Sequence, residues 1–292
     1  MSRLRPWLIA ARPATLWASV APVLVGSGLA WGQGVFRADG SAVALVSAVL
    51  INIGANFAND ASDARRGADG AARIGPTRAV ASGLISPRRM WAGVAIVFAL
   101  ASAGGIYLAV IAGWPVLVIG AACLLAAVGY TGGPFPYGYR AMGEAAVFVF
   151  FGLAGTVGSR FVHDGTAPLA AWLLAIPVGM LVSAILVANN VRDLDTDRAA
   201  GKRTLAVLLG RRGARWLFAG LVWGAFAVLA VEAAAGRVPR LTALGLLAVP
   251  LAIPVVLTIN RETAGPVLIR ALQATARLNL LAGALIAVGA AL

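Results

Sequence analysis

The apolar residues of this chain fall into long blocks rather than into the short alternation that is typical of a soluble protein. Nine stretches carry almost no charge, and each is close to the roughly 20 residues that a helix needs to cross a hydrocarbon layer. We therefore predict nine transmembrane helices. They cover residues 14–32, 41–59, 90–110, 113–130, 145–162, 168–190, 216–236, 241–259 and 272–292.

The distribution of charge supports this count and orients the chain. With nine alternating spans, 20 of the 24 Lys and Arg residues fall on the side of the N-terminus, and four fall on the other side. Cytoplasmic loops retain an excess of cations, so we predict a cytoplasmic N-terminus and an outer C-terminus. We expect the first span to stay in the bilayer, because Arg3, Arg5 and Arg12 precede a stretch longer than the apolar region of a cleavable signal.

Composition places the chain in the all-α integral membrane class, with 60% apolar and 12% charged residues. The net charge of +13 reflects topology and attraction to anionic headgroups rather than binding of nucleic acid. The lone Cys123, inside the fourth span, excludes a disulfide framework and a thiolate metal site. The many Arg, Ala and Gly residues are typical of a GC-rich bacterial gene, so we expect a bacterial cell (inner) membrane. The sequence does not indicate an oligomeric state.

A polar stretch, NFANDASDARRGAD at residues 56–69, ends the second predicted span. On a helix, Asn52, Asn56, Asp60 and Asp63 share one face, which runs from inside the span to its cytoplasmic mouth. Polar groups at membrane depth usually line a cavity. The alternative is that these residues only cap the helix and solvate a loop.

The same pattern recurs at the end of the sixth span, in ANNVRDLDTDRAAGKRTLAVLLG. The matched residues are Asn56, Asp60, Asp63 and Gly67 in the first copy and Asn189, Asp193, Asp197 and Gly201 in the second. We therefore predict one domain, residues 1–292, with two pseudo-repeat halves at approximately 13–140 and 141–260 and an added ninth helix. Two carboxylate clusters that face each other indicate one shared binding site rather than two independent helix caps.

Carboxylates at this density repel one another unless cations lie between them, and oxygen ligands suit Mg²⁺, which often bridges to phosphate. The loops after both clusters are rich in Arg and Lys and would neutralise a diphosphate. Arg78 and Lys202 follow their Asp clusters in matching loop regions, so we predict that they contact it. Each of these cations serves equally well as a determinant of topology.

The residues resemble a known family over almost the whole chain, the intramembrane aromatic prenyltransferases of the UbiA superfamily. The segments that carry the resemblance are ARPATLWASVAPVLVG, NFANDASDARRGAD followed by RIGPTRAVASG, YTGGPFPYGYRAMGEAAVFVFFG and NNVRDLDTDRAAGKRTLAVLLG. Within the superfamily, RIGPTR and PFPYGYRAMGE are most similar to the branch that prenylates 1,4-dihydroxy-2-naphthoate in menaquinone biosynthesis. Position 64 is Ala where many relatives carry a carboxylate, so either Asp63 or Asp69 completes the metal shell, and Asp195 is a further candidate.

The resemblance implies a UbiA-type helical bundle that transfers a polyprenyl group from its diphosphate to the naphthoate, with loss of CO₂ and diphosphate. It also implies two Mg²⁺ ions, which would bind the diphosphate and stabilise it as it leaves. The implied metal ligands are Asp60, Asp63, Asp193 and Asp197, assisted by Asn56 and Asn189. The implied substrate-binding residues are Asn56, Asn59, Asn189, Arg78, Lys202, Thr131, Arg12 and Arg140.

Three of these residues have a competing explanation. Tyr130 matches a family position near the allylic carbon, where an aromatic face favours a cation, but Tyr at a helix end is also an interfacial anchor. Arg12 and Arg140 are candidates to hold the carboxylate of the acceptor, because guanidinium binds carboxylate bidentately, yet both are also explained as topology charges. His163 is expected in a surface loop on the outer side.

Two other functions remain open from sequence. A transporter with repeated halves would place charges at the bilayer midplane, whereas these carboxylates gather at one face, which favours an enzyme. Another prenyltransferase of the superfamily would take homogentisate, 4-hydroxybenzoate or a lipid acceptor. The length of the prenyl chain is not indicated.

Overall fold

The computed structural model describes residues 4–67, 75 and 77–292. Within them the regular secondary structure is helical, apart from one isolated bridge between Arg140 and Arg203, and loops connect the helices. The helical segments in chain order are α1 (Arg5–Ala11), η1 (Pro13–Thr15), α2 (Trp17–Gly32), α3 (Ala38–Arg65), α4 (Pro87–Ala112), α5 (Pro115–Gly129), η2 (Tyr137–Tyr139), α6 (Gly143–Val147), η3 (Phe148–Ala154), α7 (Gly155–Phe161), α8 (Leu169–Ala199), α9 (Leu205–Ala234), η4 (Arg240–Ala248), α10 (Val249–Arg261) and α11 (Gly265–Ala291).

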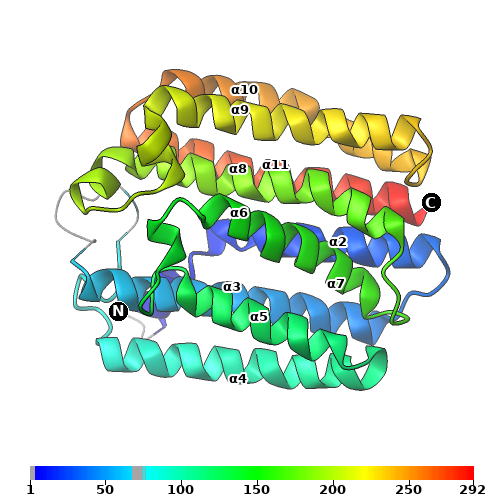
Figure 1. Ribbon diagram of the computed structural model, residues 1–292, viewed down its shortest axis with the longest axis horizontal. Helices are drawn as coiled ribbons and strands as arrows, with labels where there is room; N and C mark the ends of the chain where they lie inside the picture. Colours follow the sequence, from blue (N-terminus) through cyan, green and yellow to red (C-terminus); the bar gives the residue numbers. More distant parts are fainter. Residues whose placement is uncertain (1–3, 68–74, 76) are drawn as a thin grey trace.

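The long helices lie side by side in an elongated bundle, with the two chain ends at opposite ends of it (Figure 1). We call the end at which α3 and α8 finish the motif end, because both Asp motifs lie there. The other end, where α2 and α7 finish, is the far end. The N-terminus lies at the motif end and the C-terminus at the far end.

Each of the nine predicted spans is helical over most of its length, but three of them, 14–32, 145–162 and 241–259, are divided among consecutive helical segments. The nine also do not all meet the length and polarity expected of a membrane span. Among the described residues, seven helices are long and apolar enough to cross a membrane. The pair formed by Arg5–Thr15 and Trp17–Gly32, bent by 53°, brings the number to eight if it is one span. Helix α5, with 15 residues, is shorter. The chain is therefore a multi-pass helical membrane protein, and nine crossings remain a prediction.

Several helices extend beyond their predicted spans at the motif end. Helix α3 continues to Arg65 and α8 to Ala199, whereas hydropathy predicts ends at residues 59 and 190. The reason is that hydropathy detects only the part of a helix in hydrocarbon. Both Asp motifs therefore lie on regular helix, as the predicted polar face requires.

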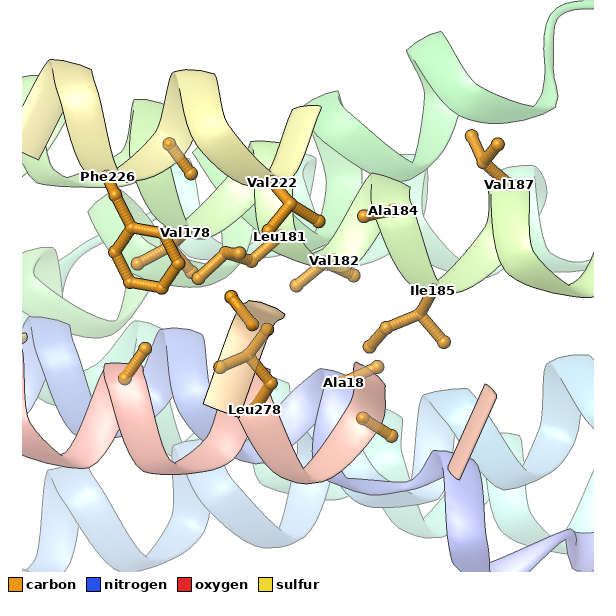
Figure 2. Packing of buried hydrophobic residues seen from close by; sticks show 14 of the residues in the cluster. Ala18, Val178, Leu181, Val182, Ala184, Ile185, Val187, Val222, Phe226 and Leu278 are labelled. Atoms are coloured by element: carbon orange, nitrogen blue, oxygen red, sulfur yellow. The ribbon is translucent and has the colours of Figure 1, made fainter. Parts of the chain in front are cut away.

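Helix α8 forms the centre of the larger core cluster. It packs against α9, α11 and α2, and Figure 2 shows Val178, Leu181 and Val182 of α8 between Phe226 of α9 and Leu278 of α11. A smaller cluster joins α1, α3 and α4 around Phe57. This packing fixes α8 relative to its neighbours and so holds the second Asp motif in place.

Between α6 and α7, the chain widens into a π-helix, Phe148–Ala154. Such segments are rare and are frequently found at functional sites. Gly152 of this segment lies so close to α8 that a Cβ atom there would be 2.5 Å from the Cα of Gly179. The contact brings Phe150 and Phe151 to the wall of the central cavity described below.

Candidate active site

The first Asp motif lies on the last three turns of α3. Asp63 is almost fully buried and accepts hydrogen bonds from Arg78 at 3.1 Å and from the hydroxyl of Tyr139 at 2.8 Å. Asn56 donates its amide to the carbonyl of Ala11 at 3.0 Å. The polar face of α3 is therefore buried within the protein and does not act as a simple solvated cap.

Asp60 has a different environment from Asp63. Its two carboxylate oxygens accept the backbone N–H groups of Ala79 and Val80, each at 2.9 Å, and the side chain is 1% exposed. These contacts fasten the loop before α4 to α3. Asp60 does not line the cavity, so its predicted role as a metal ligand requires these contacts to change and stays a prediction.

The second Asp motif lies on the last three turns of α8. Arg192 binds the carboxylate of Asp193 through two contacts, at 2.7 and 2.5 Å, and donates to Asn189 at 2.8 Å. Lys202, just beyond the helix, lies 3.7 Å from Asp197. Every one of these carboxylates thus faces a cation, the arrangement that closely spaced negative charges require.

Lys202 joins the two motifs. Its ammonium lies 3.4 Å from Asp63 in addition to Asp197, and 4.8 Å from the centre of the Tyr139 ring. The backbone of Arg203 donates to the carbonyl of Tyr139 at 3.1 Å. The loop between α5 and α6, which carries Tyr139, therefore connects the two motifs, and the predicted facing of the two clusters is observed.

A cavity of about 360 Å³ opens between the motifs and continues among α2, α3, α5 and η3 toward the far end. Its polar end and its apolar remainder fit an amphiphile with a charged head and a hydrocarbon tail. Most of the predicted site residues line it: Arg12, Asn56, Asn59, Asp63, Arg78, Tyr130, Thr131, Asn189, Asp193, Asp197 and Lys202.

Two further predicted residues, Arg140 and Asp195, lie outside the cavity. Besides Asp60, Arg140 does not line the cavity, because its guanidinium lies over the ring of Phe135 at 4.0 Å. Asp195 is 69% exposed and pairs with Arg211 at 2.7 Å, so in this structure it faces away from the second motif. Asp69 falls outside the described residues.

Two residues at the end of α5 shape the mouth of the cavity. Thr131 donates its hydroxyl to Asn59 at 2.9 Å, and the ring of Tyr130 meets that of Tyr137 edge to face at 5.4 Å. Burial, with a smaller effect of Cys123, raises the pKa of Tyr137 to about 12, so its hydroxyl stays neutral and donates to the carbonyl of Ala126. Tyr130 is thereby held with its ring at the cavity.

The donor set fits Mg²⁺. The cavity is lined by carboxylate and amide oxygens, which are the ligands of hard cations. No three His, Cys, Asp or Glu side chains converge into a ready-made metal cluster among the residues that the structure describes. Mg²⁺ commonly takes only one or two carboxylates, keeps water and shares phosphate oxygens, so these residues suit an ion that binds together with a diphosphate.

Sequence reasoning missed Tyr139 and Asn190 of this site and Glu144 behind it, and it considered Arg192 only as one of the loop cations that would neutralise a diphosphate. All four lie inside the segments that carried the family resemblance. Their roles depend on contacts between the loop after α5 and the end of α8, as in the hydrogen bond from Asn190 to Glu144 at 2.9 Å. Helical spacing within a single motif does not reveal such contacts.

Comparison with known proteins agrees with this geometry. The family model described as the UbiA prenyltransferase family matches residues 19–289. The chain belongs to this family. The 1,4-dihydroxy-2-naphthoate octaprenyltransferase of Mycobacterium leprae is 37% identical over 284 residues, which are 94% of this chain and 92% of the relative. The Escherichia coli protein of the same name is 38% identical over 79% of this chain and 77% of its own length.

Solved structures of UbiA homologues share the fold. The homologue from Aeropyrum pernix gives a TM-score of 0.70 at 19% identity, over 94% of this chain and 96% of its own. The homologue from Archaeoglobus fulgidus, solved with DMAPP and Mg²⁺ bound, gives 0.65 at 16% identity, over 97% and 99% of the two chains. These likenesses show that the chain has the fold of the solved UbiA homologues.

Proposed function

We propose that this UbiA-family protein transfers a polyprenyl group from its diphosphate to 1,4-dihydroxy-2-naphthoate, giving demethylmenaquinol in menaquinone biosynthesis. The observation that carries the proposal is its 37% identity, over 92% of the relative's length, to an enzyme named for that acceptor. The convergence of both Asp motifs on one cavity supplies a place for the reaction.

The reaction breaks the bond between the allylic carbon and the diphosphate oxygen, and the electron pair leaves with the diphosphate. The ring carbon that bears the carboxylate then bonds to the allylic carbon, and the electrons of the carboxylate bond return to the ring as CO₂ departs. When bound, Mg²⁺ would neutralise the charge of the diphosphate and stabilise it as a leaving group.

We assign the metal to Asp63, Asp193 and Asp197 at the motif end, with Asn56 and Asn189 beside them. Two ions and the participation of Asp60 are part of the same proposal. The cations that hold these carboxylates, Arg78, Arg192 and Lys202, would turn toward the diphosphate once a metal replaces them as partners.

The remaining residues of the cavity are assigned by position. The ring of Tyr130 would stabilise positive charge on the allylic carbon, and Asn59 and Thr131 form the wall beside it. Arg12 lies at the break between α1 and α2 and lines the cavity, so it would hold the carboxylate of the acceptor. Arg140, placed on Phe135, would need to swing away to share that role.

We further propose that the chain crosses a bacterial cell membrane nine times, with the motif end in the cytoplasm and the C-terminus outside. The two pseudo-repeat halves, at approximately 13–140 and 141–260, would each contribute one Asp motif. The apolar part of the cavity would receive the prenyl tail from the bilayer, while the polar acceptor arrives from the cytoplasm.

A panel of acceptors tests the proposed function. Purified protein with Mg²⁺ and a polyprenyl diphosphate is offered the naphthoate, 4-hydroxybenzoate and homogentisate, and prenylated product and released CO₂ are both measured. We expect product from the naphthoate with one CO₂ for each prenyl group transferred. Prenylation of 4-hydroxybenzoate without reaction of the naphthoate would reassign the acceptor.

A further inference from the structure

A carboxyl group lies behind the wall of the cavity, and the mechanism above does not use it. Glu144 is the second residue of α6 and is 7% exposed. It does not line the cavity. Its Oε1 accepts a hydrogen bond from Nδ2 of Asn190 at 2.9 Å, and Asn190 does line the cavity. Glu144 therefore reaches the cavity only through this amide.

The contact decides which way the Asn190 amide points. A carboxylate only accepts hydrogen bonds, whereas an amide has a donating and an accepting end. Because the donating end is bound to Glu144, the carbonyl oxygen Oδ1 is the end left to the cavity. Asn190 thus offers an acceptor, and a bound molecule must supply the donor.

The depth of Asn190 indicates what that molecule is. It lies one turn of α8 further from the motif end than Asp193. Asn190 and its neighbour Asn189 are the last polar cavity residues of α8 before Leu186 and Ile185, which begin the apolar wall. Tyr130 lies at the same depth of the cavity. Its hydroxyl oxygen is 3.2 Å from the point that a Cβ atom would occupy if Gly143, the neighbour of Glu144, had a side chain. A hydrated metal suits the carboxylates, while an aromatic ring with a hydroxyl suits this boundary.

We propose that Oδ1 of Asn190 accepts a hydrogen bond from a hydroxyl group of the aromatic acceptor, and that Glu144 is the positioning residue that fixes the amide in this orientation. The inference rests on the proposed function for the identity of the acceptor. It makes the hydroxyl of the acceptor a requirement for binding, in addition to its carboxylate.

The test begins with Glu144→Gln, which keeps the size of the side chain. The carboxylate of Glu144 also accepts its own backbone N–H, so the glutamine oxygen is expected to stay on that N–H and the glutamine NH₂ to face Asn190, which turns the Asn190 amide around. Facing an amide donor, the hydroxyl of the naphthoate loses the partner for its own proton and can only accept, through its weaker phenolic oxygen. We expect roughly a tenfold loss of affinity. We expect KM for the naphthoate to rise by that factor. KM for the prenyl diphosphate and the half-saturating Mg²⁺ concentration should not change.

The double variant Glu144→Gln with Asn190→Asp supplies the rescue. The introduced glutamine amide then donates to one oxygen of the introduced aspartate, and the other oxygen again faces the cavity as an acceptor, so KM for the naphthoate should return close to the wild-type value. Asn190→Asp alone places two carboxylates together and should be the least stable form. Ser183→Ala is the matched control, because Ser183 binds the backbone carbonyl of Glu144 at 3.2 Å without touching the amide.

A second measurement separates recognition from structure. Naphthoate analogues with either hydroxyl converted to methoxy, which cannot donate, are compared as competitive inhibitors of the wild type and of Glu144→Gln. The wild type should prefer one free hydroxyl by about tenfold, and the variant should lose that preference. An unchanged preference, a shifted Mg²⁺ requirement, or a double variant no better than Glu144→Gln would overturn the inference. A wild type that does not turn over the naphthoate would instead overturn the proposed function.

Discussion

The two carboxylates Asp60 and Asp195 show how strongly the environment of a residue decides its role. Replacing Asp60 by Asn leaves one acceptor and turns an NH₂ group toward a backbone N–H, which costs about 1–3 kcal/mol for a buried group. We expect the free energy of unfolding of Asp60→Asn to fall by that amount, measured by thermal unfolding in detergent. Asp195→Asn, at an exposed pair with Arg211, should change it by less than about 1 kcal/mol. Equal stability of the two variants would contradict the structural role of Asp60.

His163 gives a prediction about pH. The sequence predicts a surface loop for it, but it is 4% exposed, accepts the backbone N–H of Arg37 at Nδ1, and stacks on Phe36. Burial, followed by the charge of Arg160, lowers its pKa to about 4. The unfolded chain, with a pKa near 6.5, then binds more protons between these values, so the stability that His163 contributes is lost as pH falls through this window.

The measurement is the unfolding temperature at pH 7.5 and at pH 5. From pH 7.5 to pH 5, the unfolding temperature of the wild type should fall by more than that of His163→Asn. The asparagine cannot be protonated but keeps an acceptor for the backbone N–H of Arg37. Equal pH dependence of the two proteins would show that another group controls acid stability.

At the scale of elements, the close crossing of η3 and α8 is the most sensitive contact. A Cβ at Gly152 would lie 2.5 Å from the Cα of Gly179, and backbone atoms cannot yield as a side chain does. Gly152→Ala should therefore destabilise the protein by roughly 1–3 kcal/mol. Gly220→Ala in α9 meets no atom within 4 Å and should be neutral or stabilising by up to about 1 kcal/mol. Thermal unfolding of both variants in the same detergent checks the contrast, and equal losses would contradict the packing.

Which elements form was largely predictable, but how they bend was not. Long uncharged runs located every segment that became a long helix, since hydrocarbon admits little else. The π-helix at Phe148–Ala154 and the left-handed Arg12, with a φ of 53°, leave no mark in hydropathy. Both lie beside contacts between segments distant in sequence: Gly152 with Gly179 at the π-helix, and Asn56 with the carbonyl of Ala11 just before Arg12.

At the scale of the whole molecule, the sequence predicted that the two Asp motifs would face one another but not what would join them. The repeat placed Asp63 and Asp197 at the same end of the bundle. It did not reveal that Lys202 binds both, or that Tyr139 enters from a third segment to donate to Asp63. Spacing within a motif fixes which face a residue occupies, whereas contacts between motifs are set by the packing of α8 in the bundle.

The orientation in the membrane is a separate prediction at this scale. The excess of Lys and Arg on the N-terminal side predicts that the motif end lies in the cytoplasm, and the termini lie at opposite ends of the bundle (Figure 1). A reporter that is active only outside the cell, fused after Leu292, should therefore be active. A paired reporter that works only in the cytoplasm should be silent there, and the reverse result would overturn the orientation.

The central claim is that carboxylates from both motifs act together on one Mg²⁺-dependent reaction. The most direct test is a Mg²⁺ titration of turnover for the wild type, Asp63→Asn and Asp197→Asn, with Asp195→Asn as the control and thermal unfolding to confirm the fold. Loss of a few kcal/mol of leaving-group stabilisation corresponds to roughly a hundredfold in rate. We expect at least that loss in both motif variants and near wild-type turnover for Asp195→Asn. Wild-type turnover of Asp63→Asn and Asp197→Asn across the whole titration would contradict the account.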